Sequence, residues 1–207
     1  MNSLRTALLE RVVIADGAMG TMLQAQNPSL EDFQNHEGCN EILNVTRPDI
    51  VKAVHEEYLK VGVDAIETNT FGANFANLAE YGIEDRIYEL AFAGAQIARQ
   101  VADQYTTDEK PRWVLGSLGP GTKLPTLGHT TYELLKKAYE TASTGLIEGG
   151  SDALLIETTQ DLLQAKSAVN GARDAITKSK KDIVKINKNK GFVRNFSLRR
   201  LVRIAIA

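Results

Sequence analysis

Polar and conformationally special residues follow four short apolar runs along the chain. They are Asp16-Gly17, residues 67–70 (Glu-Thr-Asn-Thr), residues 117–121 (Ser-Leu-Gly-Pro-Gly) and residues 157–159 (Glu-Thr-Thr). The carboxylates of Asp16 and Glu157 could bind an ammonium group, and the backbone N–H groups at the Gly17 turn could bind a carboxylate. In outline, this pattern predicts a cradle for an amino acid.

Each of these residues also has a purely structural interpretation. Asp16 could cap a helix or turn, and Glu157 could pair with a basic neighbour, because single acids are common at strand ends of α/β folds. Glu67 could be the buried partner of a backbone amide, and Gly119 could simply form a tight turn. Both interpretations stay open on these residues alone.

The apolar runs alternate with segments of helical spacing. We expect strands over residues 12–15, 63–70, 113–118 and 153–157. We expect helices over residues 50–61, 87–105, 132–148 and about 162–172. Thr46 is the expected N-cap of the first of these helices, with Pro48 in its first turn, and Thr159 or Asp161 is the expected N-cap of the last.

Four strand-then-helix units require parallel strands with helical crossovers, either in an open doubly wound sheet or in part of a β/α barrel. In both architectures the carboxyl ends of the strands form the site. A dinucleotide site is disfavoured because no G-x-G-x-x-G follows the first strand and Asp16 stands where the pyrophosphate would approach.

Composition narrows the class of protein further. The 207 residues are 43% hydrophobic and 24% charged, as in one globular domain, and no run is long and apolar enough for a membrane span or a secretory signal. We therefore expect a cytoplasmic protein with no membrane partner. Cys39 is the single cysteine and cannot form an internal disulfide or, by itself, a structural zinc site. His36, His55 and His129 lack ligand spacing.

Five blocks in order, spread over residues 8 to about 176, make the chain resemble a known family. The blocks are residues 14–23 (IADGAMGTML), 40–49 (NEILNVTRPD), 67–73 (ETNTFGA), 116–121 (GSLGPG) and 155–161 (LIETTQD). Together they are similar to the homocysteine S-methyltransferase family, and most to its cobalamin-dependent branch. The betaine- or S-methylmethionine-dependent branches are the alternative within the family.

The resemblance implies a TIM-type β/α barrel enzyme that binds homocysteine at its strand ends. Asp16 and Glu157 would contact the amino group, with the backbone of Gly17 and Ala18 near the carboxylate. The remaining pocket residues that it implies are Thr68, Asn69, Ser117 and Gly119. The reaction would transfer a methyl group from methylcobalamin, recharged by methyltetrahydrofolate, to the homocysteine sulfur.

The family uses zinc, held by three cysteines of later strands, to stabilise the substrate thiolate. This sequence contains none of those cysteines, so we assign it no catalytic residue and no metal ligand. Cobalamin, in the family, is bound by other modules.

The charge inverts near the carboxyl end of the sequence. Residues 1–177 carry a net charge of −11, whereas residues 178–207 carry +9. We expect residues 1–177 to be half of a barrel, because about eight strand-helix units are needed and about four are present. We expect residues 178–207 to be a divergent basic tail without a clean fifth unit.

The charge inversion, the loss of family resemblance after about residue 177 and the missing fifth unit together suggest a truncated or frame-shifted product that is inactive alone. The alternatives are a non-catalytic amino-acid-binding fragment, and a complementing half whose partner is the remainder of the enzyme as a separate chain. A tail that binds nucleic acid is a further alternative, but we do not expect it, because no aromatic or recognition-helix motif accompanies the lysines.

Overall fold

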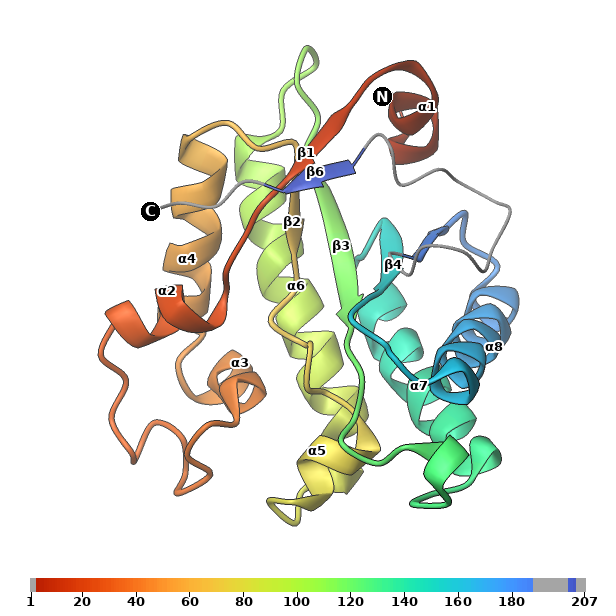
Figure 1. Ribbon diagram of the computed structural model, residues 1–207. Coiled ribbons are helices and arrows are strands. Elements are labelled where there is room, and N and C mark those ends of the chain that lie inside the picture. The colour runs from red at the N-terminus through yellow and green to blue at the C-terminus, as the bar shows by residue number, and fades with distance from the viewer. Residues whose placement is uncertain (1–2, 188–200, 204–207) are drawn as a thin grey trace.

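The strands of the protein form one parallel sheet (Figure 1). The computed structural model describes residues 3–187 and 201–203. Within them the strand order is β5-β4-β3-β2-β1-β6, and every neighbouring pair is parallel. The strands are β1 (Val13–Ala15), β2 (Ala65–Glu67), β3 (Trp113–Leu118), β4 (Ala153–Ile156), β5 (Val184–Asn187) and β6 (Leu201–Arg203).

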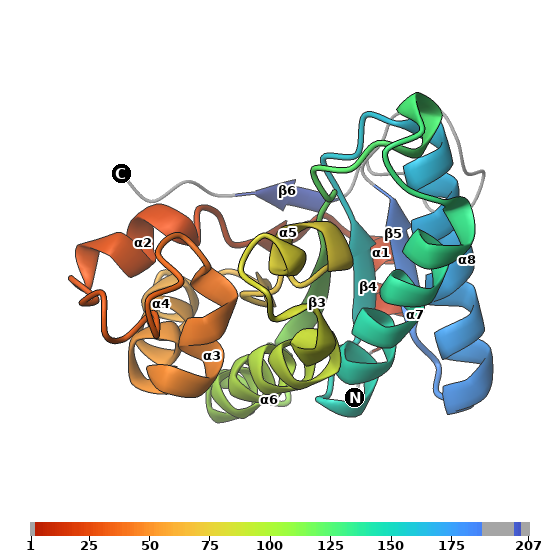
Figure 2. The same ribbon diagram turned by 90° about the horizontal axis from the view of Figure 1, so that it is seen from below.

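Four long helices lie next to one another along one face of the sheet, as the view onto the carboxyl ends of the strands shows (Figure 2). They are α4 (Pro48–Lys60), α6 (Ile87–Tyr105), α7 (Tyr132–Glu148) and α8 (Leu162–Ser179). The shorter helices are α1 (Leu4–Glu10), α2 (Gly20–Ala25), α3 (Leu43–Thr46), α5 (Phe75–Ala79) and the 3-10 turns η1 (Asn40–Ile42), η2 (Glu84–Arg86) and η3 (Pro125–Leu127). None of the helices in the described part of the chain combines the length and apolar character that a bilayer span needs.

Side chains of the strands alternate between two cores. Ile66, Val114 and Leu154 pack with the long helices in the larger core. Their neighbours along each strand point to the opposite face and form a smaller core with α1, whose members are Leu4, Ala7, Leu8, Val13, Ala15, Ala65, Trp113, Leu115, Ala153, Leu155 and Val184. Both faces of the strands are therefore apolar, which explains why the strands read as continuous hydrophobic runs.

Asp64 and Asp152 directly precede β2 and β4, and each makes the same kind of contact with a neighbouring strand. The Asp64 carboxylate accepts from the Ile14 N–H at 2.9 Å, and the Asp152 carboxylate accepts from the Val114 N–H at 2.8 Å. Each is also paired with an arginine, Arg11 and Arg99 respectively. Burial opposes ionisation of both. The bonds from Arg11 and Ile14 outweigh it and lower the pKa of Asp64, whereas for Asp152 burial is the larger effect and the pKa is raised. These aspartates tie neighbouring strands together at their amino ends.

The expected helices and strands are present with small changes at their ends. The strand over 113–118 and the helices over 87–105 and 132–148 have the expected bounds, and Asp161 is the N-cap of α8 through bonds to two backbone N–H groups. The expectation for Thr46 is wrong. Its hydroxyl donates to the Ile42 carbonyl within the preceding helix, and Arg47 precedes Pro48 without a side-chain cap.

The basic tail contains a further strand, β5, which was not among the four strands expected from the sequence. Val184 pairs with Ala153, and β5 continues parallel to β4 as far as Asn187. Ile183 and Val184 are 7% and 3% exposed, so their burial places the segment in the sheet despite its lysines. Leu201–Arg203 pairs with β1 in the same sense. The rest of the basic tail, residues 188–200 and 204–207, lies outside the described residues.

His55 should make the fold sensitive to acid. Its side chain is fully buried on α4, neither ring nitrogen has a hydrogen-bond partner within the described residues, and burial lowers the pKa to about 4. The unfolded chain therefore binds a proton at higher pH than the folded chain does. The part of the free energy of unfolding that depends on a neutral His55 is fully present above pH ~6.5. It is lost as the pH falls towards 4, a total of about 3 kcal/mol.

We predict that His55→Leu flattens this part of the stability profile. Urea unfolding of both proteins between pH 4 and 8 should show the wild type losing about 3 kcal/mol more than the variant on acidification. Parallel profiles for the two proteins would contradict the assignment.

Candidate functional site

A cleft of about 580 Å³ opens at the carboxyl ends of β1 to β4. The alternation that places Ala65, Leu115 and Leu155 on the face opposite the long helices continues to the carboxyl ends of the strands. Glu67 and Ser117, within β2 and β3, and Glu157, directly after β4, therefore have the same parity. The lining residues are Asp16, Gly17, Ala18, Met19, Gly20, Asn40, Glu41, Glu67, Thr68, Asn69, Phe71, Ser117, Glu157 and Thr158. The four polar strand ends identified in the sequence therefore meet.

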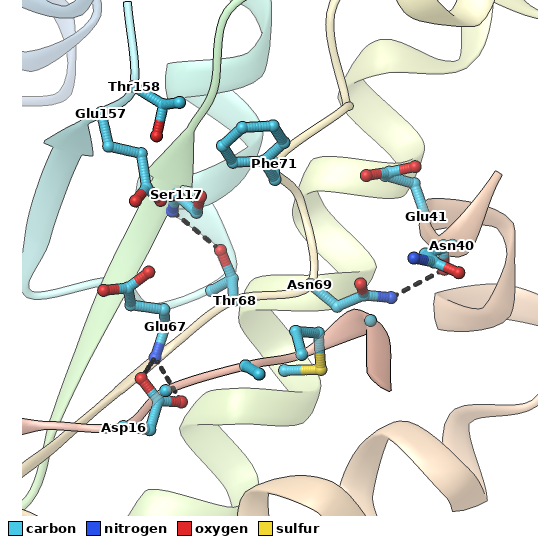
Figure 3. A pocket seen from close by; sticks show the side chains of 14 residues that line it. Asp16, Asn40, Glu41, Glu67, Thr68, Asn69, Phe71, Ser117, Glu157 and Thr158 are labelled. Atoms are coloured by element: carbon cyan, nitrogen blue, oxygen red, sulfur yellow. Dashed lines mark hydrogen bonds between the residues drawn. The ribbon is translucent and has the colours of Figure 1, made fainter. Parts of the chain in front are cut away.

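Asp16 joins the ends of β1 and β2. Both of its carboxylate oxygens lie 3.0 Å from the backbone nitrogen of Glu67, which donates to them (Figure 3). Asp16 is 1% exposed and Glu67 is 5% exposed. This bond is made by the Glu67 backbone N–H and therefore differs from the structural interpretation of Glu67, in which its side chain would be the partner of a backbone amide.

Thr68, Ser117 and Glu157 form a chain of hydrogen bonds across β2, β3 and β4. The Ser117 N–H donates to the Thr68 hydroxyl at 3.0 Å, and the Ser117 hydroxyl donates to Glu157 Oε1 at 2.7 Å. All three side chains are at least 97% buried. The serine therefore fixes one oxygen of the Glu157 carboxylate.

The turn at Gly17 and Ala18, directly after Asp16, also lines the cleft. The Tyr58 hydroxyl, on the buried face of α4, donates to the Ala18 carbonyl at 2.9 Å. Gly17 is partly buried and Ala18 is exposed, so the backbone of this turn is accessible from the cleft. Helix α4 thereby sets the position of a turn about forty residues earlier in the chain.

Asn69 connects the cleft to the loop before α3. Its amide donates to the Asn40 carbonyl at 2.7 Å and to Asn44 Oδ1 at 3.0 Å, while the Asn44 amide donates back to the Asn69 carbonyl at 2.8 Å. Asn69 is 4% exposed. Its amide group is thus engaged in holding the wall of the cleft together.

Glu41 is an acid in the cleft wall that the sequence pattern did not identify as a site residue. Its carboxylate accepts from the Gly72 N–H at 2.6 Å and from the Cys39 thiol at 3.8 Å. Burial raises the pKa of the Glu41 carboxyl, and burial together with the charge of Glu41 raises the pKa of the Cys39 thiol to about 11. Cys39 is therefore a protonated, buried donor to Glu41.

Gly119 lies behind the cleft wall and not on its surface. A Cβ at this position would come within 2.4 Å of the Phe71 carbonyl oxygen, to which the Gly119 N–H donates at 3.2 Å. Phe71 is the residue that lines the cleft here. Gly119 acts on the pocket through Phe71, because only glycine lets the two segments approach so closely.

Sequence reasoning gave no site role to Met19, Gly20, Asn40, Glu41, Phe71 or Thr158, which also line the cleft. All six fall inside the blocks that carry the family resemblance, and Thr158 also belongs to one of the four polar strand ends. Thr158 has a φ of 58°, which is rare for a β-branched residue and marks a constrained backbone next to Glu157.

The described residues do not fit the zinc ion that the resemblance implies. No group of three His, Cys, Asp or Glu side chains within residues 3–187 and 201–203 could hold a metal. Cys39 is directed to Glu41, and the sequence contains no second cysteine. The cleft instead gathers the acids Asp16, Glu67 and Glu157, with no basic side chain among its described lining residues. This arrangement favours a cationic group such as an ammonium.

The parallel sheet with helices along one face places the chain among β/α-barrel proteins. Its fold matches the homocysteine methyltransferase MmuM from Escherichia coli in the metallated form, with a TM-score of 0.68 and 22% identity over 89% of this chain and 65% of that one. The oxidised form of the same protein gives the same values, apart from 64% coverage of that chain. The partial-barrel prediction is confirmed.

The model of the homocysteine S-methyltransferase family matches residues 13–199. The chain belongs to this family, which confirms the resemblance seen in the five blocks. It is 54% identical over 176 residues to methionine synthase of Mycobacterium tuberculosis and 53% identical to that of Mycobacterium leprae. Each match covers 85% of this chain and 15% of the relative, so the chain spans a small part of the length of these proteins.

We predict that Tyr58→Phe loosens the Gly17–Ala18 turn without unfolding the domain. Losing the bond to the Ala18 carbonyl should lower the free energy of unfolding by about 1 kcal/mol. Amide exchange measured by NMR should accelerate at residues 17–20 and stay unchanged in β3 and β4. Unchanged exchange at residues 17–20 would show that Tyr58 does not position the turn.

Proposed function

We propose that this chain forms the homocysteine-binding part of a methyltransferase that methylates the sulfur of homocysteine to give methionine. Family membership and the methionine synthase relatives support this proposal. The observation that carries it is the convergence of Asp16, Glu67 and Glu157 beside the Gly17–Ala18 turn in one cleft.

The substrate's amino-acid group matches the two kinds of surface in this cleft. The ammonium would lie against the carboxylates of Asp16 and Glu157, with Ser117 keeping Glu157 in place. The carboxylate would lie at the backbone of Gly17 and Ala18, whose position Tyr58 sets. Thr68 and Asn69 would complete the pocket as wall residues, because their polar groups are engaged in bonds to neighbouring segments.

For the methyl donor, we propose methylcobalamin recharged from methyltetrahydrofolate, because the high identity is to proteins named methionine synthase. The cobalamin would be carried by other modules. A zinc ion that activates the substrate thiol would have to take cysteine ligands from other polypeptide, since Cys39 is the single cysteine of these 207 residues. This chain would supply recognition of the amino acid, and its partner would be that further polypeptide.

We predict that neutralising either acid weakens homocysteine binding by roughly tenfold to a hundredfold. Asp16→Asn and Glu157→Gln keep the shape and an acceptor oxygen for Glu67 N–H or Ser117, but they remove a charge-assisted bond worth about 1.5–3 kcal/mol. Isothermal titration calorimetry of the folded variants measures the loss. Glu133→Gln, in the exposed first turn of α7, is the matched control and should bind like the wild type. Equal affinities in all four proteins would contradict the proposed site.

We predict that zinc has no effect on homocysteine binding by this chain alone. Titration after EDTA treatment and titration with added zinc should give the same affinity, because ammonium and carboxylate recognition needs no metal and the described residues hold no metal cluster. Tight binding that requires zinc would show that ligands come from an arrangement other than the one described.

A further inference from the structure

Phe71 is an exposed aromatic side chain in a cleft whose other lining residues are mostly polar. It is 42% exposed, and with Met19 it is one of two large apolar side chains among the described lining residues. In the view of Figure 3 its ring lies between Glu157 on one side and Glu41 on the other. An aromatic ring left half-exposed at a cleft indicates a surface that a ligand covers.

The backbone around Phe71 is fixed from two sides. The Phe71 carbonyl accepts from Gly119 N–H at 3.2 Å, and the next N–H, that of Gly72, donates to Glu41 Oε1 at 2.6 Å. Neither glycine has room for a side chain, since a Cβ at Gly72 would lie 2.7 Å from that same oxygen and one at Gly119 would meet Phe71. The turn that carries the ring therefore has little freedom to move.

Glu41 is an unusual choice for a residue that only closes a loop. It is 8% exposed, and burying a carboxyl group costs free energy that an apolar residue at the same place would not. It accepts hydrogen bonds from the Gly72 N–H and the Cys39 thiol, so its carboxylate links the loop before α3 to the turn that carries Phe71. Because Glu41 lines the cleft, this unfavourable burial of a carboxyl group occurs at the candidate site.

We propose that Phe71 is a specificity-determining residue that packs against the apolar arm of the amino-acid substrate, and that Glu41 is the positioning residue that holds it there. The inference rests on the proposed function. Once the ammonium and carboxylate of homocysteine are bound near Asp16, Glu157 and the Gly17 turn, two methylenes and a sulfur remain. These need apolar contact, and a sulfur atom packs favourably on an aromatic ring.

The test of Phe71 compares homocysteine with alanine, which has the same amino-acid group and no arm. In calorimetric titrations the wild type should bind homocysteine more tightly than alanine. Phe71→Ala should weaken homocysteine binding by about tenfold, as expected for lost contact with one or two methylene-sized groups, and leave alanine binding unchanged. Phe71→Leu, which keeps an apolar side chain, should lose about threefold.

Tyr88→Ala is the control for removing an exposed aromatic ring. Tyr88 is 39% exposed on α6, does not line the cleft and stacks on Phe92. Its variant should keep the wild-type preference for homocysteine. A preference that survives both Phe71 substitutions would overturn the role of Phe71 while leaving the proposed function intact, whereas a wild type that binds no homocysteine would remove both.

Glu41 is tested by a pair of variants and a readout that needs no ligand. Glu41→Gln keeps an oxygen that can accept from Gly72 N–H, whereas Glu41→Ala does not. Amide exchange at Gly72, followed by NMR, should accelerate at least about tenfold in Glu41→Ala and stay near the wild-type rate in Glu41→Gln. The homocysteine-to-alanine preference should fall only in Glu41→Ala. Unchanged exchange and preference in Glu41→Ala would overturn the positioning role.

Discussion

Parallel hydrogen bonding between β1, β2, β3 and β4 in a single register is the constraint on which the cleft depends. The carboxyl ends of the four strands meet at one edge of the sheet, and side chains of equal parity leave the strands on the same side. Glu67, Ser117 and Glu157 are neighbours for this reason. A slip of one residue would turn each of them towards the long helices. The packing of these helices against the other face of the strands favours this register, and α4 also contacts the cleft directly through Tyr58.

Carboxylates hold neighbouring strands together at both the amino ends and the carboxyl ends of the strands. At the amino ends, Asp64 and Asp152 accept from a neighbouring strand's N–H, and arginines pair with both. At the carboxyl ends Asp16 accepts from the Glu67 N–H in a similar way, but the described lining of the cleft includes no basic side chain. The same kind of bond therefore joins neighbouring strands at both ends of the sheet, and at the carboxyl ends it involves acids that line the cleft.

In the function proposed for this chain, recognition of the amino acid and chemistry at its sulfur draw on different parts of the polypeptide. The described residues provide acids, an accessible backbone turn and an apolar wall at Phe71. The chain covers 15% of the length of its methionine synthase relatives. This division fits the proposal that this chain orients the substrate, while thiol activation and methyl delivery come from further polypeptide.

The sequence by itself determined the strand-helix alternation, the parallel sheet and the acids Asp16 and Glu157 at strand ends, because apolar runs, periodicity and turn residues are local signals. It did not indicate β5, because the lysines around Ile183 and Val184 made this buried segment resemble a solvated tail. Tertiary structure alone decided that Glu41 reaches Gly72 across thirty-one residues and that Gly119 acts through Phe71. Contacts between distant segments depend on how helices and loops pack, and no local pattern encodes that packing.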